Sequence, residues 1–252
     1  MITIKNAQSI KYMREANFIV GKLLHDIASL IKPGVTTMEL DKFADDFIRS
    51  YDAYPAFKGF RVEGLPPFPG AICASVNDCI VHGIPSENVI LKEGDIIGID
   101  VGTLKNGHYG DGARTYSVGK ISEAAQRLMD VTKEALDRGM AATRDGARVG
   151  DISFAIGSFV RKMGYFVADD LTGHGIGTDL HEDPAIPNDG KKNRGPRLKK
   201  GMTIAIEPMV NIGTNKVQER GWEFFVKDGT LSAHFENTIL ITENSYEILT
   251  HY

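Results

Sequence analysis

Two stretches of the chain, one in each half, share one pattern of apolar residues, glycines and acidic residues. The shift that carries Leu24 onto Leu136 also superposes the following pairs: Gly34 and Gly146, Glu39 and Asp151, Leu40 and Ile152, Phe47 and Phe159, and Tyr54 and Phe166. A slightly smaller shift places LKEGDIIGID (91–100) on LKKGMTIAIE (198–207). The alternative is a chance match between two ordinary helix pairs and two apolar strands.

A genuine repeat restricts the fold more than any other feature of the sequence. It predicts two α+β halves, residues 1–120 and 121–252 in rough terms, related by a pseudo-two-fold axis. Each half would bring one acidic residue, Asp100 or Glu207, from a central strand to a shared cleft. The 252 residues suit one α/β domain or two small ones, and 42% hydrophobic residues are enough for a substantial core.

Apolar periodicity predicts the helices and strands. One face of a long first helix carries Ile10, Met13, Ala16, Val20, Leu24, Ile27 and Ile31. This helix should end before Pro33-Gly34, and Thr36 with Glu39 then forms a capping box. The second helix has an apolar face made of Leu40, Phe43, Phe47 and Tyr51. Strand-like segments follow at 71–76, 95–102, 112–118, 202–210 and 236–242.

A predicted hairpin brings two aspartates together. Asn106-Gly107 lies between apolar runs and indicates a two-residue turn, because both turn residues need positive φ. The turn pairs Gly102 with Asp111, so Asp100 and Asp111 become diagonal neighbours on one face, about 7–8 Å apart at the backbone. Such carboxylates repel each other and need compensation, which divalent cations supply. On the hairpin alone, an aspartate that points into water is an equal alternative.

Three further segments place chemically active side chains in apolar or glycine-rich surroundings. His174 and His181 both lie in the glycine-rich stretch 172–184, where glycines let the backbone approach a ligand. Glu207 lies inside an apolar strand directly before a proline, and Glu236 opens another apolar strand. A buried, unpaired carboxylate is costly or stays protonated, so each of these glutamates needs a partner.

These residues form a carboxylate-rich set made of Asp100, Asp111, His174, Glu207 and Glu236. Oxygen ligands with one imidazole suit Mn, Fe(II), Co or Zn, and no cysteine pattern indicates a structural zinc site. Two metal ions about 3.5–4 Å apart need bridging carboxylates and hold a hydroxide between them. The sequence therefore predicts a dinuclear hydrolytic centre.

Six segments around these residues carry recognisable motifs: NDCIVHGIP (77–85), GDIIGIDVG (94–102), GDGARTYSVG (110–119), GHGIGTDLHEDP (173–184), IAIEPM (204–209) and SAHFENTILIT (232–242). Together they resemble the methionine aminopeptidase family in its compact type I form, and only the segment 1–70 shows weaker similarity. The resemblance implies the pita-bread fold, an α+β fold of two pseudo-two-fold-related halves with a curved antiparallel sheet flanked by helices. It also implies a single catalytic domain over residues 1–252.

By motif, the resemblance implies that two divalent metal ions are held by Asp100, Asp111, His174, Glu207 and Glu236. Asp111 and Glu236 would bridge the ions, Asp100 would complete one site, and His174 with Glu207 would complete the other. Glu207 would also shuttle the proton, and His82 and His181 would contact the substrate. The implied reaction is attack by a metal-bound hydroxide on the first peptide carbonyl, which removes an N-terminal Met that precedes a small residue.

The resemblance also implies a pocket for the methionine side chain. Cys73 and Trp222 align with its lining, since a soft thiol and an aromatic wall suit a thioether. Plain core packing is the alternative for both residues. The sequence does not say which aromatic residue of the segment 57–68 points into the pocket; the candidates are Phe57, Phe60 and Phe68.

The chain departs from the usual family pattern in three places: Leu180, the longer loop 61–68 and His234. We expect these departures to change the shape of the pocket and to leave the metal chemistry intact. The backbone around Asn77, Cys79 and Ser232 resembles a monovalent-cation site of the family, and one such ion is a further expectation.

Two rival hypotheses stay open. A proline-directed aminopeptidase or dipeptidase of the same fold would usually carry an additional N-terminal domain, and this chain starts almost directly at the first predicted helix. A non-catalytic, peptide-binding protein of this fold would have lost metal ligands, whereas all five positions are filled here.

Composition restricts the partners and the compartment. A net charge of −4 gives no footprint for nucleic acid, and no apolar run is long enough to cross a membrane. The N-terminus has no signal-peptide core, and two cysteines in a chain of this length predict reduced, half-buried thiols. We expect a cytoplasmic monomer that acts on peptide or nascent-protein N-termini; association with the ribosome stays open.

Overall fold

The computed structural model describes residues 2–252, so residue 1 of the predicted domain lies outside the described residues. The helices are α1 (Ala7–Ile27), a short 3-10 helix (Ala28–Leu30), α2 (Thr37–Ser50), α3 (Glu123–Ala141) and α4 (Val149–Lys162). The strands are β1 (Tyr54–Pro55), β2 (Ile72–Val76), β3 (Cys79–Val81), β4 (Ile96–Lys105), β5 (His108–Ser117), β6 (Phe166–Val167), β7 (Thr172–Gly175), β8 (Glu182–Pro187), β9 (Thr203–Ile206), β10 (Met209–Asn211), β11 (Val217–Arg220), β12 (Glu223–Val226), β13 (Ser232–His234), β14 (Asn237–Ile241) and β15 (Tyr246–Ile248).

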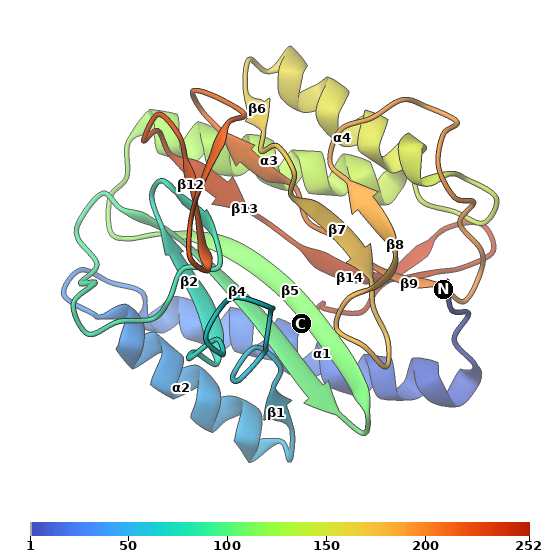
Figure 1. The fold of residues 1–252 in the computed structure, drawn as a ribbon, viewed down its shortest axis with the longest axis horizontal. Coiled ribbons are helices and arrows are strands. Elements are labelled where there is room, and N and C mark those ends of the chain that lie inside the picture. Colours follow the sequence, from blue (N-terminus) through green and yellow to red (C-terminus); the bar gives the residue numbers. More distant parts are fainter. Residues whose placement is uncertain (1) are drawn as a thin grey trace.

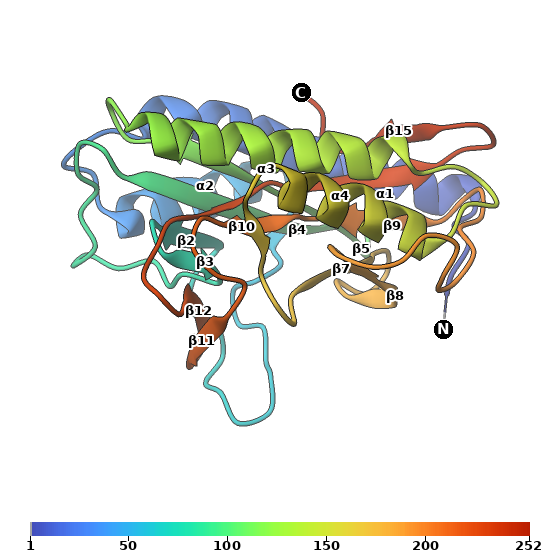
Figure 2. The same ribbon diagram turned by 90° about the horizontal axis from the view of Figure 1, so that it is seen from above.

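The helices form one layer and the strands a second layer. The pair α1 and α2 lies along one half of the molecule, and the pair α3 and α4 lies along the other half (Figure 1). Seen from above, all four helices cover the same side of the strands, while β11, β12 and a long pale-blue loop extend from the opposite side (Figure 2). The helices therefore leave the loop side of the sheet open for a site.

The two halves repeat each other in detail. The shift that carries Leu24 onto Leu136 also carries both ends of α2 onto the ends of α4, and the smaller shift carries the start of β4 onto the start of β9. The turn before each second helix is also held in the same way: the Gly34 N–H donates to Leu91 O at 2.8 Å, and the Gly146 N–H donates to Leu198 O at 3.0 Å. These equivalent hydrogen bonds support the predicted pseudo-two-fold relation between the two halves.

The predicted capping box at the start of α2 is present. The Glu39 N–H donates to Thr36 Oγ1 at 3.1 Å, and the Thr36 N–H donates to the Glu39 carboxylate at 2.7 Å. The predicted apolar face of α2 needs correction, because its fully buried residues are Thr37, Leu40, Asp41, Ala44 and Ile48. The predicted aromatic residues Phe43, Phe47 and Tyr51 are only partly buried and pack against the margin of the core.

All strand pairs in the described residues are antiparallel. The first half contains a sheet in the order β1-β4-β2, with β5 also paired to β4, and the second contains a sheet in the order β15-β14-β9-β7-β8. Two smaller sheets have the orders β13-β10-β6 and β11-β12-β3. The predicted segment 202–210 is divided into β9 and β10 by Glu207 and Pro208, since proline cannot donate to the ladder.

The hairpin of β4 and β5 has the predicted register. Gly102 pairs with Asp111, and Asp100 pairs with Ala113. The turn residues Asn106 and Gly107 have φ values of 52° and 71°, as a two-residue hairpin turn of this kind requires. The two aspartates therefore lie on one face of the sheet. This face is the loop side, where the other site residues described below also lie.

Hydrogen bonds from β5 join the two halves. The Glu236 N–H donates to Ala113 O at 2.9 Å. The Thr238 hydroxyl donates to Asp111 O at 2.8 Å, and the Thr115 hydroxyl donates to His234 O at 2.8 Å. These hydrogen bonds join the segment that carries Asp111 to the segment that carries Glu236. Their acceptors are backbone carbonyl oxygens, so they fix the distance between the two halves of the site.

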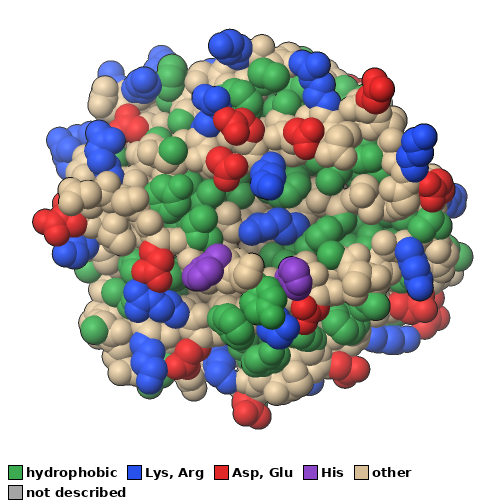
Figure 3. Space-filling view, turned by 180° about the vertical axis from the view of Figure 1, so that it is seen from behind, with side chains coloured by type: hydrophobic (Ala, Val, Ile, Leu, Met, Phe, Trp, Pro, Cys, Tyr) green, Lys and Arg blue, Asp and Glu red, His purple; other side chains and the backbone are tan. Residues whose placement is uncertain are grey.

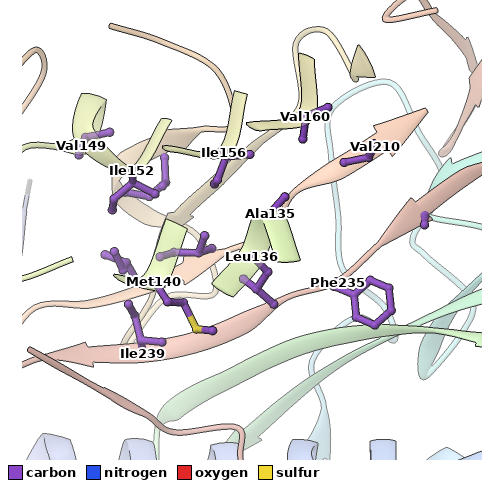
Figure 4. Packing of buried hydrophobic residues seen from close by; sticks show 14 of the residues in the cluster. Ala135, Leu136, Met140, Val149, Ile152, Ile156, Val160, Val210, Phe235 and Ile239 are labelled. Carbon is purple, nitrogen blue, oxygen red and sulfur yellow. The ribbon is translucent and has the colours of Figure 1, made fainter. Parts of the chain in front are cut away.

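Each helix pair has its own apolar core. In the second half, α3 and α4 pack onto the strands through Leu136, Met140, Ile152 and Ile156 (Figure 4). Gly139 allows the two helices to approach closely, since a Cβ there would lie 2.8 Å from the Ile156 Cδ1. The equivalent cluster in the first half joins α1 and α2 to β2 and β4.

One face of the outer surface carries charged side chains of both signs. On the face behind that of Figure 1, basic and acidic side chains alternate and no continuous field of one sign is visible (Figure 3). Within residues 2–252, no helix is both long enough and apolar enough to span a membrane.

Candidate metal centre

The five predicted metal ligands meet in one cavity of about 290 Å³ on the loop side of the sheet. They come from both halves and from five separate places: Asp100 on β4, Asp111 on β5, His174 on β7, Glu207 after β9 and Glu236 before β14. No two of these residues lie on the same strand. The motifs identify these residues in the sequence, and the fold brings their side chains into one cavity.

The ligand atoms lie close enough to share a metal ion. Nε2 of His174 lies 3.6 Å from Oδ2 of Asp111 and 3.6 Å from Oε1 of Glu207. Asp111, His174 and Glu236 each offer a ligand atom within 4.8 Å of the other two. Two carboxylates and an imidazole in such proximity are a ligand set for borderline divalent ions.

Unpaired oxygen atoms show that the site fits cations. Within the described residues, Oδ1 of Asp100, Oδ1 of Asp111 and Oε1 of Glu236 are buried and have no hydrogen-bond partner. Burial raises the pKa of Asp111 and of Glu236 well above the ordinary range, and the neighbouring carboxylates raise both further. Divalent ions would remove this repulsion and complete the coordination of these oxygen atoms.

His174 is held in the orientation and charge state of a ligand. Its Nδ1 lies 2.8 Å from the Gly175 carbonyl oxygen, so Nδ1 carries the proton and Nε2 presents its lone pair to the carboxylates. Burial lowers the pKa of His174 to about 3, and the nearby His181 contributes to this shift. The imidazole is therefore neutral at physiological pH and free to bind a metal ion.

Two glycines beside His174 allow β7 to pack closely against its neighbours. A Cβ on Gly173 would lie 2.4 Å from Ala205 O, and a Cβ on Gly175 would lie 2.2 Å from Asp183 O. The approach of the backbone to a ligand stays a prediction. The close packing fixes the position of His174.

His82 and His181 lie where a substrate would enter. Both line the 290 Å³ cavity and also a wider, adjoining cleft of about 670 Å³. His82 is half-buried and has a φ of 60°, and burial lowers its pKa to about 4. His181 is exposed, with its ring centroid 4.5 Å from that of His174 and 5.6 Å from that of Phe60. Both histidines can therefore reach a bound peptide without belonging to the ligand set.

The lining of the apolar end of the cavity shows which aromatic residues of the segment 57–68 face inward. Phe57, Phe60 and Phe68 all line it, together with Cys73, Leu180 and Trp222. The Trp222 Nε1–H donates to Pro66 O at 2.8 Å, and its ring meets Phe68 edge to face at 5.5 Å. The loop 61–68 thus holds one wall in place. Cys73 and Cys79 are free thiols, and both are buried where half-buried thiols were predicted.

Two residues near the centre have roles that the sequence analysis did not assign. Asn17 on α1 is buried, and its side-chain oxygen accepts the Asp111 N–H at 3.2 Å; its signal is a polar residue inside the apolar face of the first helix. His234 was expected to alter the shape of the pocket, yet it is not among the residues that line the cavity. Its Nε2 lies 3.4 Å from Oε2 of Glu207 instead.

Some of the residues expected to hold a monovalent cation lie close together. The Ser232 N–H donates to Asn77 O at 2.9 Å, and Cys79 begins β3 shortly after Asn77. Asn77 has a φ of 55°, which turns its carbonyl away from the direction of a regular strand. The cation itself stays a proposal.

The chain is similar to known proteins over its whole length. A methionine aminopeptidase of Clostridium acetobutylicum is 49% identical over 252 residues, covering 99% of each chain. The crystal structure of methionine aminopeptidase from Thermotoga maritima superposes with a TM-score of 0.96 at 42% identity and covers 100% of both chains. A prolidase from Pyrococcus furiosus shares the fold at 24% identity, with a TM-score of 0.80, and this chain covers only 65% of it.

These likenesses confirm the predicted α+β pita-bread fold over the full length of the chain. The family model for metallopeptidase family M24 matches residues 11–243, a range that contains all five predicted ligands and both histidines that were predicted to contact the substrate. Together with the near-complete coverage of the relatives, this match establishes the family. The chain belongs to metallopeptidase family M24.

Proposed function

We propose that this chain is a methionine aminopeptidase, a metal-dependent exopeptidase that removes N-terminal Met from peptides and nascent proteins with a small second residue. The observation that carries the proposal is one cavity with two ends, a carboxylate-rich end and an end lined by aromatic residues and a thiol. Relatives that are 49% and 46% identical over the whole chain carry the same name. The function predicted from the motifs therefore agrees with both the site and the relatives.

The five ligands would hold two divalent ions, with Asp111 and Glu236 shared between them. Bound ions of this kind polarise a carbonyl group and make water a stronger nucleophile at neutral pH. Co, Mn, Fe and Zn all suit the oxygen and imidazole donors. The number and identity of the ions belong to the proposal, as do a monovalent cation near Asn77 and the assignment of residues 1–252 to a single catalytic domain.

The remaining groups of the site act on the substrate and on its protons. The Glu207 carboxylate lines the cavity, so it could accept a proton from water and pass it to the leaving amine. The exposed His181 would donate to the developing oxyanion, and His82 would contact the next amide. The free α-amine of the substrate would reach the metal site, which would restrict cleavage to the first peptide bond.

The thioether fits the apolar end of the cavity. Cys73 and Trp222 lie there with three phenylalanine rings, and sulfur makes favourable contacts with aromatic rings. Burial and the nearby carboxylates raise the pKa of Cys73 well above its ordinary value, so the thiol stays neutral and apolar. This end of the cavity favours methionine over a proline-directed substrate.

The partners and the compartment follow from this activity. Peptide and nascent-protein N-termini would reach the ions through the wider cleft at His82 and His181. We place the enzyme in the cytoplasm as a monomer, and association with the ribosome is a further part of the proposal.

Release of Met tests the activity. Metal-stripped protein should not hydrolyse Met-Ala-Ser, and addition of Mn(II), Co(II) or Fe(II) should restore release of free Met. Glu207→Ala should lower kcat by at least about 100-fold, because it removes both a ligand and the proton acceptor. A folded, metal-loaded wild type that cleaves Xaa-Pro peptides and leaves Met-Ala-Ser intact would favour the proline-directed rival. A metal-binding protein without either activity would favour the peptide-binding rival.

Substitution of the apolar wall tests the methionine pocket. Trp222→Ala should raise KM for Met-Ala-Ser by about 10-fold or more through lost contact with the side chain, while metal stoichiometry stays unchanged. A variant at Tyr54, an exposed residue of β1, is the matched control and should leave KM unchanged. An unchanged KM for Trp222→Ala would assign this residue to core packing.

A further inference from the structure

Glu207 lies between two histidines, and only one of them belongs to the five-ligand set. Its Oε1 lies 3.6 Å from Nε2 of His174, and its Oε2 lies 3.4 Å from Nε2 of His234. Each oxygen of this carboxylate therefore faces one imidazole nitrogen. The Nε2 of His234 therefore faces an oxygen of Glu207 in the same way as the Nε2 of the expected ligand His174.

His234 is buried, and its ring nitrogen has no partner. The residue is 3% exposed, and within the described residues its Nε2 has no hydrogen-bond partner. Its backbone is fixed, because the His234 N–H donates to the Thr115 hydroxyl at 2.9 Å and its carbonyl accepts from the same hydroxyl at 2.8 Å. A buried polar nitrogen that is held toward carboxylates without a partner is costly unless a ligand completes it.

The groups around His234 form a second potential ligand cluster. Glu207, His234 and Glu236 each offer a ligand atom within 4.8 Å of the other two. The 3.4 Å separation of Nε2 and Oε2 equals the spacing of neighbouring ligands around one tetrahedral ion with bonds of about 2.1 Å. His174 faces the other oxygen of Glu207, so His234 lies across this carboxylate from His174 and toward the other metal site.

We infer that His234 is a sixth protein ligand and supplies an imidazole nitrogen to the metal site that Asp100 completes. The inference rests on the proposed two-metal centre. Without His234, that site has only the carboxylate oxygens of Asp100, Asp111 and Glu236. With it, each site has one imidazole, and nitrogen donors favour Fe(II), Co(II) and Zn(II) over Mn(II). Both sites should then fill at similar metal concentrations.

A purely structural role for His234 makes a different prediction. If Nε2 only donated a hydrogen bond to Glu207, the amide of a glutamine could replace it and metal binding would change little. If Nε2 is a ligand, His234→Gln removes the nitrogen donor from one site and leaves the His174 site intact. Metal binding thus separates the two roles without any measurement of activity.

Calorimetric titration of the metal-stripped full chain with Zn(II) or Co(II), followed by metal analysis after dialysis, measures both sites. Wild type should bind two ions tightly. His234→Gln should keep one tight ion and bind the second more than about 100-fold more weakly, since even groups that only orient a ligand change affinity by about 10–100-fold. The matched control is His108→Gln, because His108 is also a buried histidine with an unpartnered Nε2 but belongs to neither cluster of potential metal ligands among the described residues. It should bind two ions.

X-ray absorption of the zinc-loaded wild type counts the imidazoles directly and does not depend on a variant that folds. Two imidazoles for two zinc ions are expected, falling to one in His234→Gln, and free imidazole should restore the second ion to His234→Ala. One imidazole in the wild type, or two tight ions with an unchanged spectrum in His234→Gln, would overturn the inference alone. A folded wild type that binds no divalent ion would overturn the metal centre itself.

Discussion

Burial decides what each ionisable side chain of the cavity can do. The carboxyls of Asp111 and Glu236 and the imidazole of His174 are all shielded from water, and in each case burial favours the neutral form by shifting the pKa. For the histidine, this means a lone pair that is available to a metal ion. For the carboxylates, it means an unfavourable charge that a cation would relieve. The same desolvation therefore prepares both kinds of ligand.

The lowered pKa of His82 predicts how stability depends on pH. Burial lowers this pKa from 6.5 to about 4, so the unfolded chain takes up a proton before the folded chain does. The contribution of the neutral His82 to stability is complete above pH 6.5 and is lost as the pH falls toward 4. Between pH 7 and pH 5, the metal-free wild type should lose about 2 kcal/mol more of its free energy of unfolding than His82→Asn.

Urea unfolding at both pH values measures this difference. Asparagine is the chosen replacement because it tolerates the positive φ of His82, so backbone strain is not added. Equal losses in the two proteins would show that His82 titrates alike in the folded and unfolded chains.

At the scale of elements, helix α2 shows how a local signal specifies a boundary. Thr36 and Glu39 satisfy each other's backbone N–H groups at its first turn. The equivalent helix α4 uses Asp151, whose carboxylate accepts the Arg148 N–H at 2.9 Å. Each cap lies beside the turn that begins at Gly34 or Gly146. This turn is hydrogen-bonded to the segment just before β4 or β9, so the start of the helix and that strand are positioned together.

Removal of the cap on α2 should destabilise the protein by about 1 kcal/mol, within a range of about 0.5–2 kcal/mol. Thr36→Ala leaves the Glu39 N–H without its side-chain acceptor, and the urea midpoint should fall accordingly. Lys42→Ala is the control on the same helix, because its ion pair with Glu87 is solvent-exposed and contributes little. A midpoint for Thr36→Ala that equals that of Lys42→Ala would contradict the role of the cap.

At the scale of the whole molecule, the metal centre lies where the two halves join. Ligands from β4 and β5 meet ligands from β7, the end of β9 and the start of β14. Repulsion among these carboxylates opposes the association of the halves when no cation is bound. Metal binding should therefore stabilise the entire fold and not the site alone.

Thermal unfolding tests this coupling. Free metal at about 100 times its Kd should add about 2.7 kcal/mol to the free energy of unfolding, or about 5–10 °C to Tm for a chain of this size. Chelation should reverse the shift. Asp111→Asn removes a shared ligand and should show a much smaller shift at the same metal concentration. A Tm of the wild type that does not respond to metal would mean that the site does not join the halves energetically.

The sequence by itself determined the local structure and predicted which residues line the cavity. Periodicity placed the helices, the dipeptide Asn106-Gly107 set the hairpin register, and the repeat predicted two halves, because each of these signals acts between residues close in the chain or through a nearly constant shift. The motifs named five candidate ligands, and all five line the cavity.

Only the tertiary structure decided which side chains from distant segments share a surface. It placed three phenylalanine rings at the apolar end of the cavity, turned the predicted aromatic face of α2 to the margin of the core, and held Asn17 against Asp111. It also placed Nε2 of His234 beside the carboxylate of Glu207. These contacts depend on how the halves pack, and a side chain's neighbours across such an interface have no fixed spacing in the sequence.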